Sequence, residues 1–142
     1  MRIVVDSNIL FTFFWKESIF SLVINKKGLD FLSPEYALEE IKKYEEEIQK
    51  KAKLSKNQFE TRKTELVMNV GFIKLQEYQE RFKEVQQIIQ SFPKEEQEEF
   101  LSDIDFLSLA LKNNCPLWTN DKLLKKQKQI PVLSTKEIIE IL

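Results

Sequence analysis

The strongest constraint on the fold is a repeated alternation of short apolar runs with longer segments of helical periodicity. The runs have three or four residues each, and they cover 3–5, 29–32, 70–73, 116–119 and 130–133. Such short apolar runs suit strands that are buried on both faces, as in a parallel sheet joined by helical crossovers. The alternation therefore predicts one domain over residues 1–142, a three-layer α/β/α sandwich with a central parallel sheet of four to five strands.

Helical patterns fill the intervals between these runs. Ser7 or Asn8 is expected to cap the first helix. The pair Ser33-Pro34 predicts the N-cap and first position of another helix, and residues 134–137 match a capping box that opens the last one. The other predicted helices cover 9–23, 58–69, 77–91 and 95–112.

The residue composition excludes most catalytic chemistries. The chain has no histidine and one cysteine, Cys115, which rules out histidine-based triads, an intramolecular disulfide and a cysteine-rich zinc site. Catalysis would have to use carboxylates, hydroxyls, lysines or a metal bound by oxygen atoms, for which Mg²⁺ and Mn²⁺ are typical. No apolar stretch approaches the ~20 residues that span a bilayer, so we expect a cytoplasmic protein without membrane contact.

Charge is balanced overall and uneven along the chain. The 22 Lys and Arg residues against 23 Asp and Glu residues give a net charge of −1, which provides no general attraction to nucleic acid. Residues 50–63 and 122–128 are basic, whereas 94–105 is acidic. A basic run is typical of a solvated helix face, and it also suits contact with a phosphate backbone.

Carboxylates are predicted to gather where the strands end. Asp6 follows the first strand and Asp121 the fourth, and the carboxyl ends of parallel strands border the functional crevice of such folds. Glu40 lies at the border of an apolar helix face, and Asp103 and Asp105 interrupt an otherwise apolar helix. Each acid alone has a structural explanation as a cap, a turn residue or a surface charge. Together they would repel one another, which favours a bound cation.

Four segments carry a resemblance to a known family. They are VVDSNIL (4–10), SPEYALEEIKKY (33–44), DIDFLSLAL (103–111) and LWTND (117–121). In this order and spacing they resemble the motifs of the PIN-domain nucleases, which include the ribonuclease toxins of toxin–antitoxin pairs. The helical insertion at 45–66 is longer than in the compact toxins.

The resemblance implies a metal-dependent endoribonuclease that hydrolyses phosphodiester bonds with Mg²⁺ or Mn²⁺. The metal-binding and catalytic acids would be Asp6, Glu40, Asp103 and Asp121, with Asp105 either an accessory ligand or a substitute for Asp103. Asn8 and Thr119 would orient ligands or water. The implied partners are RNA, a second copy of the chain in a homodimer, and a small antitoxin protein. Lysines that would contact RNA are Lys50, Lys51, Lys53, Lys122 and Lys125.

Two other functions fit the sequence. In a phosphoryl-transfer domain, Asp6 at the strand end would accept a phosphate, although Asn8 occupies the place where such a phosphatase needs an acid. In a catalytically degenerate interaction domain, the acids would serve as helix caps, and divalent metal would leave stability unchanged.

Overall fold

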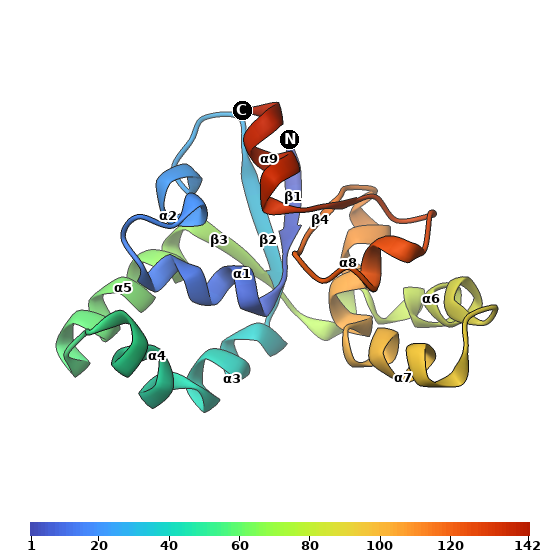
Figure 1. Cartoon of the computed structure of the whole chain (residues 1–142), viewed down its shortest axis with the longest axis horizontal. Helices are drawn as coiled ribbons and strands as arrows, with labels where there is room; N and C mark the ends of the chain where they lie inside the picture. The colour runs from blue at the N-terminus through green and yellow to red at the C-terminus, as the bar shows by residue number, and fades with distance from the viewer.

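The computed structural model describes residues 1–142 and has the predicted α/β/α architecture. All five apolar runs contribute strands to one parallel sheet, in the order β3-β2-β1-β4-β5, with helices on both sides (Figure 1). Because every strand is parallel to its neighbours, all carboxyl ends meet at one edge of the sheet. The strands are β1 (Arg2–Val5), β2 (Asp30–Pro34), β3 (Val70–Ile73), β4 (Leu117–Trp118) and β5 (Val132–Leu133).

Helices and short 3₁₀ turns make up the outer layers. The capping box predicted at the C-terminus is present, since Ser134 and Glu137 bond each other's backbone N–H groups. None of the helices has both the length and the apolar character needed to cross a membrane. The helices are α1 (Ser7–Phe11), η1 (Thr12–Phe14), α2 (Ile19–Val23), α3 (Tyr36–Lys43), α4 (Glu45–Ala52), α5 (Lys56–Asn69), η2 (Leu75–Glu77), η3 (Gln79–Arg81), α6 (Phe82–Ile89), α7 (Lys94–Ser102), α8 (Ile104–Asn113), η4 (Leu124–Lys126) and α9 (Thr135–Ile141).

Aromatic side chains fill one face of the sheet. The ring of Phe20 from α2 meets Phe31 of β2 and Trp118 of β4 edge-on, with centroids 5.3 and 5.6 Å apart. Phe14 of η1 stacks on Phe59 of α5 at 4.7 Å, which ties α5 to the same layer. The opposite face is covered by α8, which contacts β1, β2 and β4. The aromatic residues near the N-terminus are therefore largely core.

The segment 9–23 is not the single helix predicted from its periodicity. It divides into α1, η1 and α2, with Trp15 in extended conformation between the last two. Phe13 and Phe14 are adjacent in sequence and both almost fully buried. The 3₁₀ turn η1 allows both rings to point into the core. The cap of α1 is Asp6, whose side chain accepts from the N–H of Ile9, and not Ser7 or Asn8.

Ser33-Pro34 also differs from its prediction as a helix start. Both residues belong to β2, where they pair with the last residues of β3, and the Ser33 hydroxyl donates to the Val5 carbonyl oxygen at 2.9 Å. Cross-strand pairing thus uses the hydroxyl that would have capped a helix. The next helix, α3, begins at Tyr36 without a side-chain cap, and it ends at Lys43 where a second helix, α4, takes over.

The predicted helices 77–91 and 95–112 are both interrupted. Only residues 82–89 of the first are α-helical, because two 3₁₀ turns precede them. The second breaks at Asp103, whose φ of −109° and ψ of 18° separate α7 from α8. Asp103 consequently lies at the start of α8 and not within a continuous helix.

Candidate active site

The candidate site lies where the strands end, between α3 and α8 (Figure 1). Asp6 follows β1, and its backbone N–H donates to the Trp118 carbonyl oxygen at 3.2 Å, which holds it beside the end of β4. Its Oδ1 accepts from the N–H of Ile9 at 2.9 Å, and the residue is only 8% exposed. The helix cap therefore fixes one carboxylate oxygen of a nearly buried acid.

Thr119 and Asp121 follow β4 in a tight turn. The Thr119 N–H donates to the Leu133 carbonyl oxygen of β5 at 3.0 Å, and its buried Oγ1 accepts from the N–H of Asp121 at 3.1 Å. Oδ1 of Asp121 accepts from the N–H of Leu123 at 2.9 Å. The turn directs the Asp121 carboxylate toward Asp6, so that each raises the other's energy when both are charged.

Glu40 enters the site from the second turn of α3. Its Oε1 accepts a hydrogen bond of 2.5 Å from the Ser7 hydroxyl at the start of α1. From its position Ser7 is predicted only as a helix cap, and its contact with Glu40 is a feature that the tertiary structure reveals. One feature of the sequence could have indicated this contact. Ser7 directly follows Asp6, and because Asp6 caps the helix, the Ser7 hydroxyl is free to donate to a neighbouring acid.

Asp103 reaches the same place from the break between α7 and α8. It is half-buried, and neither the chain's backbone nor its side chains donate a hydrogen bond to its carboxylate. A carboxylate in this position is poorly stabilised when ionised.

Burial and the neighbouring acids raise the pKa values of Asp6 and Asp103. Burial, as the largest cause, raises the pKa of Asp6 to about 6, with Asp121 and Glu40 adding repulsion, while bonds from Thr119 and Ile9 oppose the rise. Burial likewise raises the pKa of Asp103 to about 7, with added repulsion from Asp6, Asp121 and Glu40. No lysine or arginine contributes to either shift. The four acids therefore form one electrostatic unit without an internal counter-charge.

The donor chemistry of this cluster suits a hard divalent cation. All four groups offer carboxylate oxygens, which are preferred by Mg²⁺ and Mn²⁺, and Asp121 and Glu40 each have one oxygen that no protein donor occupies. As the side chains stand, no three acids are close enough to surround a single ion. A cation would have to draw them closer, which would relieve the repulsion that raises the pKa of Asp103.

Comparison with known proteins identifies the family. A family model described as PIN domain matches residues 4–138. The chain belongs to the PIN-domain family. No curated protein matches it. Among solved structures, it resembles a chain from the crystal structure of VapBC2 from Rickettsia felis bound to a DNA fragment from their promoter, with a TM-score of 0.66 and 14% sequence identity over 94% of this chain and 98% of that one.

Asp105 of this PIN domain faces a different hollow from the other acids. Its Oδ2 accepts a hydrogen bond of 2.5 Å from the Tyr78 hydroxyl, and the two residues line a hollow of about 270 Å³ with Glu35, Tyr36 and Glu39. Asp105 does not contribute to the pKa shifts of Asp6 or Asp103. The Tyr78 hydroxyl gives the Asp105 carboxylate a hydrogen-bond donor, whereas the Asp103 carboxylate has none.

Tyr36 lies between these two groups of acids and was not singled out from the sequence. Repulsion by Glu40 is the largest cause that raises the pKa of its hydroxyl, followed by burial and then by Asp105. The residue is 44% exposed. An exposed aromatic ring next to the PIN-domain acids is available for contact with a substrate.

The remaining predicted site residues have unequal positions. Exposed Asn8 lines a cleft of about 410 Å³ together with Asp6 and Asp121, so it lies at the rim of the site. Among the predicted RNA contacts, Lys125 forms an ion pair with Glu137, and Lys51 pairs with Glu47 at 3.0 Å while also lining a hollow next to Glu40. The others, Lys50, Lys53 and Lys122, are exposed and form no ion pair.

Proposed function

We propose that this PIN domain is a Mg²⁺- or Mn²⁺-dependent endoribonuclease in which Asp6, Glu40, Asp103 and Asp121 hold the metal. The observation that carries the proposal is the state of Asp103. It is a half-buried carboxylate that receives no hydrogen bond and is repelled by three other acids, with no protein cation among its neighbours. A divalent cation is the simplest group that would stabilise all four acids in their charged forms.

A bound divalent cation would lower the pKa of a water molecule and neutralise charge on the scissile phosphate. The chain's own residues would prepare the ligands for it. Thr119 and the Ile9 N–H hold the Asp6 carboxylate, and Ser7 holds Glu40. Asn8, exposed at the rim of the cleft, has an amide that can donate to a phosphate oxygen.

We also propose RNA as the substrate and a toxin–antitoxin pair as the biological setting. Membership of the PIN-domain family supports a nuclease, and the structural similarity to a chain of the VapBC2 complex supports a search for a small protein partner. A gene for such a partner beside the gene for this chain, and growth arrest on expression that the partner relieves, are the expected observations.

The proposed activity can be tested with the purified protein and a mixed-sequence single-stranded RNA. We expect cleavage with Mg²⁺ or Mn²⁺, no cleavage with a chelator, and almost none with Asp6→Asn or Asp121→Asn. Glu98→Gln is the matched control, since Glu98 is an exposed acid of α7 without hydrogen-bond partners, and it should cleave like the wild type.

Two results would contradict this function. Cleavage that survives in the chelator or in both aspartate variants would exclude these acids as the metal site. Absence of cleavage, together with an unchanged melting temperature on addition of Mn²⁺, would favour a degenerate interaction domain. A mass increase on Asp6 after incubation with acetyl phosphate would instead indicate phosphoryl transfer.

A further inference from the structure

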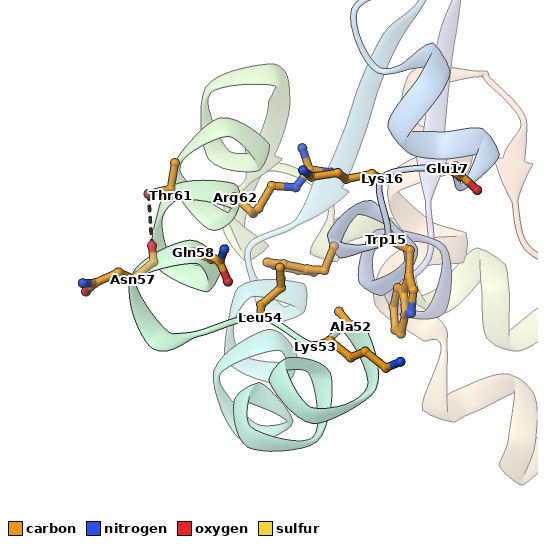
Figure 2. A pocket seen from close by; sticks show the side chains of 11 residues that line it. Trp15, Lys16, Glu17, Ala52, Lys53, Leu54, Asn57, Gln58, Thr61 and Arg62 are labelled. Carbon is orange, nitrogen blue, oxygen red and sulfur yellow. Dashed lines mark hydrogen bonds between the residues drawn. The ribbon is translucent and has the colours of Figure 1, made fainter.

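The largest pocket of the molecule lies outside the acidic cluster and has no role in the function proposed so far. It has a volume of about 690 Å³ and opens between the loop that joins η1 to α2 and the turn that joins α4 to α5 (Figure 2). Ligand-binding pockets typically have ~300–1,000 Å³. The size of this pocket therefore suits one or two planar rings.

The pocket is lined by aromatic, basic and amide side chains. Figure 2 shows Trp15 and Lys53 on one side, Asn57 and Gln58 on the opposite side, and Leu54 between them. Trp15 is half-buried and its indole N–H donates to no protein group. One surface of the indole and its N–H are therefore available to a ligand.

The charge of the pocket favours an anion. Lys16, Lys53 and Arg62 line it against one acid, Glu17. The guanidinium of Arg62 is immobilised and its charge is balanced by Glu65, because it forms an ion pair with that acid at 3.2 Å and also donates to the Phe13 carbonyl oxygen and to Ser21 Oγ at 2.9 Å. Lys16 and Lys53 form no ion pair and remain free to meet a phosphate.

A chain of shared residues connects this pocket to the acids. Asn8 lines both the cleft that holds Asp6 and Asp121 and a second hollow that holds Glu40. Trp15 lines that second hollow and also the large pocket. The three depressions thus follow one another along the surface, from the acids through Asn8 to Trp15.

We infer that the large pocket is a base-binding subsite for single-stranded RNA, in which Trp15 stacks on a base while Lys53 contacts the adjoining phosphate. The inference rests on the proposed function, since the strand would extend from the acids along the connected hollows. Sequence-tolerant recognition of single strands combines aromatic stacking with a cationic track. Gln58 also lines the pocket, and its side-chain NH₂ can donate to the edge of a base while its Oε1 accepts from the Ser55 N–H.

Tryptophan fluorescence provides a direct test, because the chain has only Trp15 and Trp118 and the latter is 1% exposed. A fluorescein-labelled mixed-sequence 12-nucleotide RNA, added in chelator to prevent cleavage, should raise the anisotropy of the label and quench Trp15 emission. Trp15→Ala should weaken binding by about 5- to 150-fold, the range of a lost base stack. Trp15→Phe keeps an aromatic face and should recover part of that affinity.

Lys53 allows a second test that does not depend on folding of the tryptophan variant. Lys53 has a left-handed backbone with φ of 56°, which suits glycine, so Lys53→Gly removes the charge without straining the turn. It should lower the slope of log K against log salt by about 0.7, the value for one phosphate contact with a single strand. Lys83→Ala, which removes an exposed charge on α6, should leave the slope unchanged.

The outcomes separate the two proposals. If the wild type cleaves RNA while the Trp15 and Lys53 variants bind and cleave it like the wild type, the subsite is wrong and the nuclease stands. If RNA neither binds nor is cleaved, both are wrong. If the variants keep RNA affinity but lose binding to the protein encoded by the adjacent gene, the pocket is a protein-docking surface and the RNA subsite is refuted.

Discussion

Replacing Asp103 by Asn is expected to stabilise the metal-free protein at neutral pH. Burial and three neighbouring acids raise the pKa of Asp103 from 3.8 to about 7. The folded state therefore binds more protons than the unfolded state between these values, and stability falls as the pH rises through this window. Asparagine does not titrate, so it avoids this loss.

The size of the effect follows from the pKa values. One pKa unit corresponds to about 1.4 kcal/mol, so an ionised Asp103 costs the fold roughly 4 kcal/mol relative to its protonated form. Solvent screens part of this at a half-buried position, which leaves about 2 to 4 kcal/mol. For a domain of this size ~1 kcal/mol changes the melting temperature by about 3 °C, which gives a rise of roughly 6 to 12 °C.

The assay is thermal unfolding in chelator at pH 4 and pH 8. Asp103→Asn should melt well above the wild type at pH 8 and close to it at pH 4, where the native carboxyl is already protonated. Glu98→Gln, the exposed control, should melt like the wild type at both values. An Asp103→Asn variant that is no more stable at pH 8 would refute the reasoning that the four acids are electrostatically strained without a metal.

Three further predictions concern the metal, a positioning residue and the core. Mn²⁺ at 100 times its Kd should stabilise the wild type at pH 8 by about 2.7 kcal/mol, measured by thermal unfolding; an equal gain in Asp6→Asn would argue against the site. Ser7→Ala frees Glu40 and should weaken Mn²⁺ binding by about 10-fold in calorimetry, and an unchanged Kd would remove Ser7 from the site. Phe59→Ala removes a fully buried ring stacked on Phe14 and should cost about 3 to 5 kcal/mol in urea unfolding; a loss below about 1 kcal/mol would contradict the packing described.

Local pattern was sufficient to place the strands along the chain and to predict that they form one parallel sheet. Apolar runs such as 3–5 lie where strands formed, because a strand buried on both faces leaves little freedom in residue type. The placement of Asp6 after β1 and of Asp121 after β4 followed from this, since a parallel sheet puts these ends together. Spacing along the chain was enough to nominate the acids.

Helix boundaries near the site were less predictable from the sequence. The division of 9–23 goes with the burial of both Phe13 and Phe14 in the core, and helical periodicity does not predict it or the break at Asp103. Ser33 illustrates the reason, because its hydroxyl is a good helix cap but bonds the Val5 carbonyl oxygen of the neighbouring strand instead. Tertiary packing determines which of two locally adequate partners a polar group takes.

The sequence by itself limited the candidate chemistry: it contains no histidine, its candidate metal ligands are oxygen groups, and Asp6 and Asp121 follow strands that a parallel sheet brings together. Only the tertiary structure decided how the candidate acids differ. The Tyr78 hydroxyl donates a hydrogen bond to the Asp105 carboxylate. The Asp103 carboxylate receives no hydrogen bond and lies near three other carboxylates. Burial and neighbouring charge are properties of three-dimensional contact, so two acids separated by one residue in the chain acquire different surroundings, and those of Asp103 raise its pKa to about 7.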